Sequence, residues 1–332
     1  MLLRVLGSAA GGGSPQWNCG CPVCTAVRCG AGTARTQSSV AVSADGRRWF
    51  LINASPDVRT QIEAFPGLHP RDGDRTTPLR AVLLTDAELD HTLGLLMLRE
   101  ADALQLYATP AVQKTLYDGS GLLRTLERYC AVEWRAVVPG ADMALADGLS
   151  CRAFDVPTSK RDRFSNSTEK PPPGGVDFSD KPWDSTEEPP PGGVDFSDMP
   201  WTGVDHGRVV GFRLTDQHSG GTLVYLPGVQ SLTPELRAEI AGCDCLLIDG
   251  TCWRDDELVR LGLAAKTARE MGHLPVDGPD GSLAQLGSLG VRRTIFIHMN
   301  NTNPILLDGT PERRSVEENG MEVAVDGLEV EV

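Results

Sequence analysis

The sequence contains no segment long and apolar enough to cross a membrane. None of its apolar runs approaches about 18 residues, which is the length that a membrane-spanning helix needs. The opening MLLRVLGSAAGGGSP is a short apolar run that passes into glycines, without the apolar core and cleavage pattern of a signal peptide. We therefore expect a cytoplasmic protein that has no membrane partner.

Basic residues are fewer than acidic residues in this sequence. There are 31 Lys and Arg residues against 45 Asp and Glu residues, which gives a formal net charge of -14. An acidic surface disfavours polyanions, so we expect no nucleic-acid partner. The glycine fingerprint G-x-G-x-x-G is also absent after any predicted strand, and GSAAGGGSP opens no helix. The sequence therefore predicts no separate site for an organic cofactor.

Strand and helix signals alternate along the chain. At 332 residues, with 40% hydrophobic and 23% charged residues, the chain can bury a substantial core. Helical spacing is found over 56–66, 91–102, 109–118, 233–242 and 281–290. Short apolar or alternating runs predict strands over 2–7, 38–44, 48–54, 79–86, 104–110, 222–228, 243–250 and 293–299. This alternation favours an α/β fold, and we expect residues 1–332 to form one domain.

One segment does not fit the alternating pattern. Residues 167–183 read STEKPPPGGVDFSDKPW, and residues 185–201 repeat this sequence almost unchanged. Proline triplets and glycine pairs oppose regular structure, so we expect a mobile Pro/Gly-rich insertion over 165–202. Each copy carries an aromatic pair, which leaves open whether the insertion is a peptide-docking arm or a duplication tolerated in a surface loop.

Three of the nine cysteines lie within six residues of one another. CGCPVC places Cys19, Cys21 and Cys24 in a tight turn whose sulfurs can converge on one ion. We therefore expect a zinc knuckle over 17–29. Structural zinc takes four ligands, so the fourth must come from elsewhere, with Cys29 and the HMNNTN segment around Asn301 as candidates. The alternative is a loop that carries three reduced thiols.

Polar side chains capable of metal or acid–base chemistry follow several of the predicted strands. The carboxyl ends of strands are where layered α/β folds place their sites. Three histidines are found at or near such positions, and one of them follows an aspartate directly. The residues concerned are Asp86, Glu88, Asp90, His91, Asp249, His273 and His298.

The strand-end stretch D86-A-E88-L-D90-H91 resembles the H-x-H-x-D-H metal motif of the metallo-β-lactamase superfamily. A closer resemblance is to the PQQ (pyrroloquinoline quinone) biosynthesis protein B family. It is carried by VLGSAAGGGSPQWNCGCPVC, ARTQSS, NASPDVR, LDHTLGLLMLRE, LLIDGTCW, REMGHLP and IHMNNTNPIL. These resemblances imply an αββα sandwich of the metallo-β-lactamase type.

The resemblance also implies a metal centre with a single ion. A two-metal hydrolase of this fold would carry histidines at the positions of Asp86 and Glu88, and a bridging carboxylate at Gly228. Asp90, His91 and His298 remain, and two histidines with one carboxylate form the pattern of non-haem Fe(II) oxygenases. The expected cofactors are therefore Fe(II) at this centre and structural Zn(II) at the knuckle.

The resemblance further implies hydroxylation of the tyrosine ring of a Glu–Tyr-derived small molecule or peptide, with O2 and an external reductant. His273 is then expected as an acid–base group, and Asp249 as a ligand or as the anchor of a histidine. Asp86 and Glu88 either bind the amino group of the substrate or form a solvated turn.

Asn300 and Thr302 are expected beside the substrate, in a polar network behind His298. The alternatives are a non-catalytic carrier of PQQ or its precursor, and a metal-dependent hydrolase. Whether the chain forms a homodimer stays open.

Overall fold

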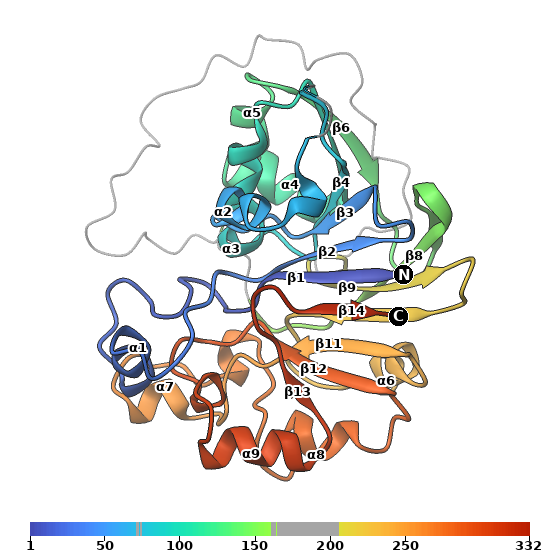
Figure 1. The fold of residues 1–332 in the computed structure, drawn as a ribbon. Helices are drawn as coiled ribbons and strands as arrows, with labels where there is room; N and C mark the ends of the chain where they lie inside the picture. Colours follow the sequence, from blue (N-terminus) through green and yellow to red (C-terminus); the bar gives the residue numbers. More distant parts are fainter. Residues whose placement is uncertain (71–72, 74, 161–163, 165–205) are drawn as a thin grey trace.

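Two β-sheets lie face to face in this protein, and helices cover their outer surfaces (Figure 1). The computed structural model describes residues 1–70, 73, 75–160, 164 and 206–332. The insertion predicted over 165–202 lies outside the described residues. The αββα arrangement expected from the sequence is confirmed.

The first sheet contains seven strands within the described residues, and β14 pairs with β1 so that the two chain ends lie together. Strands β3 to β6 run parallel to one another. In spatial order the strands are β14 (Glu329–Glu331), β1 (Leu2–Gly7), β2 (Ser39–Ser43), β3 (Trp49–Ile52), β4 (Leu79–Leu83), β5 (Ala103–Ala108) and β6 (Ala131–Ala136).

The second sheet also has seven strands in the part of the chain that the structure describes. Strands β10 to β13 are parallel, and β7 to β9 pair antiparallel. In spatial order the strands are β13 (Glu322–Val323), β12 (Arg293–Ile297), β11 (Cys245–Asp249), β10 (Thr222–Leu226), β9 (Val210–Asp216), β8 (Leu149–Asp155) and β7 (Asp142–Ala144).

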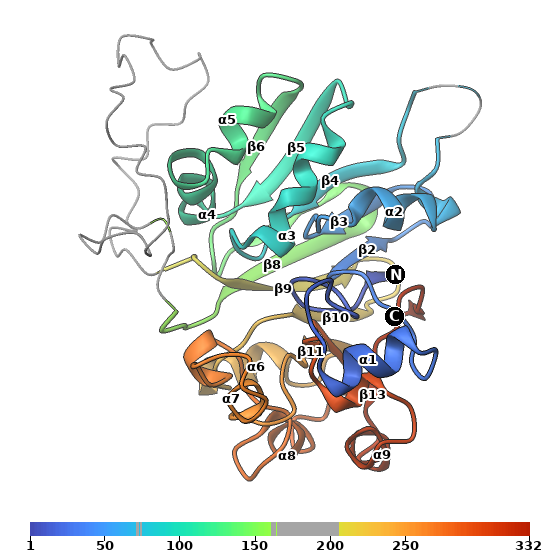
Figure 2. The same ribbon diagram turned by 90° about the vertical axis from the view of Figure 1, so that its left-hand side faces the viewer.

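Helices α2 to α5 cover the first sheet, and α6, α8 and α9 cover the second (Figures 1 and 2). Helix α6 begins as predicted, because the side chain of Thr233 accepts a hydrogen bond from the Leu236 amide and proline follows at the first helical position. The α-helices are α1 (Pro22–Arg28), α2 (Val58–Glu63), α3 (Leu89–Thr92), α4 (Pro110–Lys114), α5 (Leu122–Leu126), α6 (Pro234–Ile240), α7 (Glu257–Arg260), α8 (Ser282–Leu286) and α9 (Pro311–Glu318).

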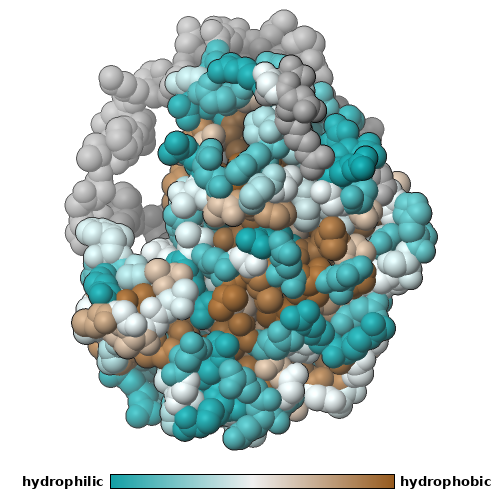
Figure 3. All heavy atoms as spheres, in the orientation of Figure 1, coloured by the Kyte–Doolittle hydropathy of each residue, from teal (hydrophilic) through white to brown (hydrophobic). Residues whose placement is uncertain are grey.

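The core consists of two apolar layers. Alternate residues of a strand point to opposite faces, so Phe50 and Ile52 of β3 face the second sheet while Trp49 and Leu51 face the helices. Both faces of the strand are therefore buried, as expected for a parallel strand covered on both sides. Hydrophobic residues also reach the surface over the middle of the face shown in Figure 1, between more hydrophilic helical layers (Figure 3).

All eight predicted strands are present, with small shifts at their ends. Because β3 and β4 run parallel in one sheet and β10 to β12 run parallel in the other, their carboxyl ends meet along one edge of the sandwich. The polar residues that follow these strands therefore gather at that edge. No helix among the described residues is long and apolar enough to cross a membrane.

Candidate metal centre

Asp90, His91 and His298 come together at the edge where the parallel strands end. Asp90 and His91 lie in the short helix α3, which follows β4, and His298 directly follows β12. Their ligand atoms all lie within 4.8 Å of one another. Nε2 of His298 is 3.2 Å from Oδ2 of Asp90, and the ring centroids of His91 and His298 are 5.0 Å apart. This is the spacing of side chains that can share one metal ion.

His91 is held from behind by Asp86. Nδ1 of His91 lies 2.9 and 2.8 Å from the two carboxylate oxygens of Asp86, so this nitrogen carries the proton and donates it. The other nitrogen, Nε2, is buried without a hydrogen-bond partner among the described residues. Burial would lower the pKa of His91, but the carboxylates of Asp86 and Asp90 outweigh burial and raise it to about 9. A metal ion would supply the partner that Nε2 lacks.

His298 is held by Thr251. The Thr251 hydroxyl lies 2.9 Å from the carbonyl oxygen of His298, which can only accept, and 3.0 Å from Nδ1 of the same residue. The single hydroxyl proton goes to the carbonyl, so Nδ1 of His298 must donate. On a neutral ring Nε2 is then an acceptor that faces the carboxylate of Asp90, and a cation between them would satisfy both groups. His298 also has a left-handed backbone with φ of 57°, which is strained for a residue with a Cβ.

Asp249 and His273 form a second pair beside the centre. Nδ1 of His273 lies 2.7 Å from Oδ2 of Asp249, and the rings of His273 and His298 stack at 5.4 Å. Asp249 is fully buried and also accepts from the amides of Val229 and Thr251. Burial raises the pKa of Asp249, but the neighbouring His273, with smaller effects of His298 and the Thr251 side chain, outweighs burial and leaves it below its usual value. Although its position with His273 and His298 is compatible with metal ligation, Asp249 serves here as the anchor of His273.

The structure gives Asp86 and Glu88 separate partners. Asp86 is buried against His91, as described above, while Glu88 is half-buried and forms an ion pair of 2.9 Å with Lys160. Asp86 therefore acts through His91 in this structure. Of Asp86 and Glu88, Glu88 is the one that reaches the surface.

Asn300 and Thr302 form a network behind His298, as expected. Nδ2 of Asn300 donates to the Thr302 hydroxyl at 2.6 Å, and that hydroxyl donates to Glu257. Glu257 also accepts from the Trp253 amide at 2.6 Å. These contacts brace the loop after β12.

Cys19, Cys21 and Cys24 converge as predicted from their spacing. Burial raises the pKa of Cys21 to about 11, whereas the pKa of Cys19 is lowered because hydrogen bonds, first from the Cys21 amide, outweigh burial. Asn301 lies beside the sulfurs, with its side-chain amide donating to Sγ of Cys24 at 3.2 Å. Cys29 is exposed and ends helix α1. Of the two candidates for a fourth contact, the structure brings Asn301 to the sulfurs.

Two glycines keep space open around the centre. A Cβ on Gly228 would meet only Cε1 of His273, at 4.0 Å, so Gly228 lies beside the site and leaves room there. A Cβ on Gly11 would lie 3.2 Å from Oδ2 of Asp90. The N-terminal segment that leads to the cysteines therefore passes directly over one of the candidate ligands.

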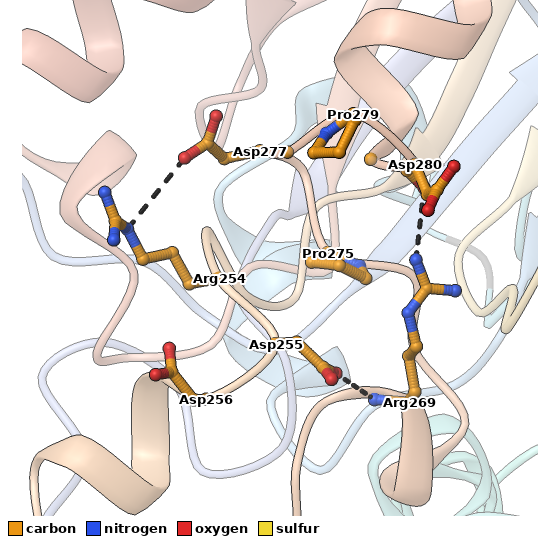
Figure 4. Close-up of a pocket in the computed structure, with 10 residues that line it drawn as sticks. Arg254, Asp255, Asp256, Arg269, Pro275, Asp277, Pro279 and Asp280 are labelled. Atoms are coloured by element: carbon orange, nitrogen blue, oxygen red, sulfur yellow. Dashed lines mark hydrogen bonds and ion pairs between the residues drawn. The ribbon is translucent and has the colours of Figure 1, made fainter.

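A separate pocket of about 330 Å³ is lined by residues 254–256, 269, 275 and 277–281 (Figure 4). One ion pair and two hydrogen bonds join the residues that line it. Arg254 lies 3.9 Å from Asp277, and Arg269 donates to the carbonyl oxygen of Asp280 at 3.1 Å. The Arg269 amide also donates to Asp255 at 2.9 Å. We assign this pocket no part in the metal chemistry.

Comparison with known proteins identifies the class. A family model described as "Beta-lactamase superfamily domain" matches residues 48–180 and 192–299. Together with the two facing sheets and the Asp–His cluster at their edge, this match shows that the protein has the metallo-β-lactamase fold. A diphosphatase from the PhnP family shares the fold, with a TM-score of 0.64 over 100% of this chain and 97% of that chain at 20% identity.

More similar proteins identify the family. "Coenzyme PQQ synthesis protein B" of Methylococcus capsulatus is 43% identical over 335 residues, which covers 99% of each chain. A protein of the same name from Azoarcus sp. is 41% identical, also over 99% of each chain. The structure of Zn(2+)-bound PqqB from Methylobacterium extorquens is 39% identical with a TM-score of 0.82 and covers 100% of both chains. The chain belongs to the coenzyme PQQ synthesis protein B family.

Proposed function

We propose that this protein is an iron- and O2-dependent hydroxylase that acts on the tyrosine ring of a Glu–Tyr-derived precursor in PQQ synthesis. One observation carries the proposal. The centre offers two imidazoles and one carboxylate, Asp90, His91 and His298, to a single ion. The positions from which a two-metal hydrolase would take further ligands are occupied otherwise, because Asp86 binds His91, Glu88 binds Lys160 and Gly228 has no side chain.

The residues fit the metals expected from the sequence. Nε2 of His91 lacks a partner, and Nε2 of His298 faces Asp90, so two imidazole nitrogens and a carboxylate oxygen point at one place. Such a set leaves coordination positions open and suits Fe(II). The three thiols with Asn301 beside them suit a closed zinc site, and a relative of this chain is described as Zn(2+)-bound.

Iron bound by these three side chains would supply the activation of O2. The reaction replaces the ring C–H next to the phenol hydroxyl by C–OH and yields a catechol. One atom of O2 enters the ring and the other leaves as water, so two electrons and two protons must come from an external reductant. The protein's part is to hold the ring in place and to move protons.

His273 is suited to the proton transfer. Its Nδ1 proton is donated to Asp249, which leaves Nε2 to accept a proton from the phenol or return one to it. Gly228 leaves the space next to His273 open, on the side where the ring would lie. Asp86 is assigned to the support of His91, while Asn300 and Thr302 support the loop that carries His298.

Anaerobic reconstitution with Fe(II), followed by O2, a reductant and a Glu–Tyr dipeptide, tests the proposal. Mass spectrometry is expected to show the gain of one oxygen atom in the product. His91→Ala and His298→Ala are expected to form no product, because each removes one of the two nitrogens. No mass change with any reductant, together with tight binding of PQQ, would instead support a carrier.

A further inference from the structure

Lys160 and Glu88 form an ion pair at the rim of the candidate metal centre. Nζ of Lys160 lies 2.9 Å from Oε1 of Glu88, and both side chains are about one-third exposed, at 28% and 32%. Solvent can therefore reach this pair. Residues 88 and 160 are far apart in the sequence, so the fold brings these two charges together.

Both partners are tied to the centre. Glu88 is the residue before helix α3, whose first turn carries Asp90 and His91, and its charge contributes to the raised pKa of His91. Lys160 packs against Gly272, because a Cβ built on Gly272 would lie 3.6 Å from Cβ and Cδ of Lys160. His273 follows Gly272 directly. The ion pair therefore spans from the ligand helix to the loop of the acid–base histidine.

We infer that Lys160 and Glu88 form the subsite for a free α-amino-acid end of the substrate, with Lys160 contacting the carboxylate and Glu88 the ammonium group. A free amino acid carries both charges on one carbon atom, so it can meet two side-chain charges that lie side by side. The four charges then alternate in sign, and each gains an opposite neighbour. Leu89, which follows Glu88 and is 50% exposed, offers apolar contact to the side chain.

This inference rests on the proposed function and makes it more specific. A tyrosine inside a peptide has neither charge on its α-carbon and would not match the pair. The subsite therefore favours a compound with a free amino-acid end, and a Glu–Tyr dipeptide, whose tyrosine nitrogen is acylated, is expected to bind as weakly as N-acetyl-L-tyrosine. The subsite also sets the α-carbon at the rim, so that the ring extends toward the open space beside Gly228.

Binding of tyrosine derivatives to the Zn(II)-loaded protein tests the subsite without turnover. L-Tyrosine, L-tyrosinamide and N-acetyl-L-tyrosine are titrated by calorimetry. For the wild type we expect each blocked form to bind about tenfold more weakly than L-tyrosine, as one charge-assisted contact is lost. Lys160→Met is expected to bind L-tyrosine no better than the amide, and Glu88→Gln no better than the acetylated form. Lys114→Met, the same substitution on helix α4, is expected to match the wild type.

Equal binding of all three compounds by the wild type, or unchanged selectivity in both variants, would overturn the subsite, as would the absence of any binding. Failure of the proposed function has a different signature. If selectivity is present and depends on Lys160 and Glu88, but Fe(II) and O2 give no oxygenated product, the subsite stands and the hydroxylase does not. If free and blocked tyrosines are hydroxylated alike, the hydroxylase stands and the subsite falls.

Discussion

The hydroxyl of Thr251 lies 3.0 Å from Nδ1 of His298 and 3.1 Å from Nδ1 of His273. One buried side chain thus contacts the imidazoles of both His298 and His273, and it fixes which nitrogen of His298 is free for a metal. Anchors of this kind commonly change metal affinity by about 10- to 100-fold.

Thr251→Val keeps the shape of the side chain and removes the hydroxyl. We expect Fe(II) affinity, measured anaerobically by chelator competition, to fall about 10- to 100-fold. Thr251→Ser restores the hydroxyl and is expected to bind as the wild type does. Thr109→Val removes a buried hydroxyl that contacts Gly207 and Val112 and none of the candidate ligands, and it serves as the control for general destabilisation. Wild-type affinity in Thr251→Val would contradict the assigned role.

The pair of His91 and Asp86 predicts a pH-dependent stability for the metal-free protein. The pKa of His91 is about 9 in the folded protein and about 6.5 in an unfolded chain. Because the folded value is the higher one, the stabilisation is complete below about pH 6.5 and is lost as the pH rises through about 9. Asp86→Asn should therefore lower the free energy of unfolding by about 2–4 kcal/mol at pH 6 and by less at pH 9.

Denaturant unfolding of the metal-free protein at several pH values measures this difference. Asp118→Asn, which alters an exposed ion pair with Arg124, is the control and should change stability by less than about 1 kcal/mol. A difference between Asp86→Asn and the wild type that stays constant from pH 6 to pH 9 would mean that His91 does not titrate as described.

The cysteine knuckle and the metal centre share the loop after β12. Asn301 contacts the sulfurs and lies three residues after His298. Cys24→Ser is therefore expected to lose one zinc ion per chain and also to weaken Fe(II) binding at the centre. Cys29→Ser changes an exposed thiol and should alter neither. Metal analysis of the purified variants, with Fe(II) titration, distinguishes these results; undiminished zinc in Cys24→Ser would contradict the knuckle.

Substitutions of Gly228 test whether the tyrosine ring occupies the space beside His273. Gly228→Ala adds a Cβ whose nearest neighbour is 4.0 Å away, so it should be tolerated with product formation near the wild-type rate. Gly228→Asp adds a carboxylate beside His273 and fills the space assigned to the ring, so product formation should fall at least about tenfold. If both variants form product equally well, the ring does not occupy this space.

The sequence predicts most of the framework because the strands concerned are apolar on both faces. Strands such as β3 and β11 are buried at every residue, and their runs are recognisable without any tertiary information. Strand β6 is largely exposed and β13 has two residues, so neither leaves a clear pattern. Strands β8 and β9, which lie on either side of the Pro/Gly-rich repeat, are not among the predicted strands, although burial largely alternates along both of them.

The supporting contacts of the site are harder to predict than its ligands. Asp90, His91 and His298 carry a motif, whereas Thr251 is an ordinary threonine until its partners, 22 and 47 residues away, are brought to it. Lys160 is likewise recognisable only once the fold places it beside Glu88. For Asp86, the sequence offers an amine contact or a solvated turn, and the contact with His91 emerges only from the three-dimensional arrangement.

Isotopically labelled O2 tests the central claim most directly. The Fe(II)-reconstituted protein is given a Glu–Tyr substrate and reductant under labelled O2 in ordinary water, and the product is analysed by mass spectrometry. We expect one labelled oxygen atom on the tyrosine ring, absent in His298→Ala. Oxygen that comes from water, or a product without added oxygen, would contradict the assignment of this centre to O2-dependent hydroxylation.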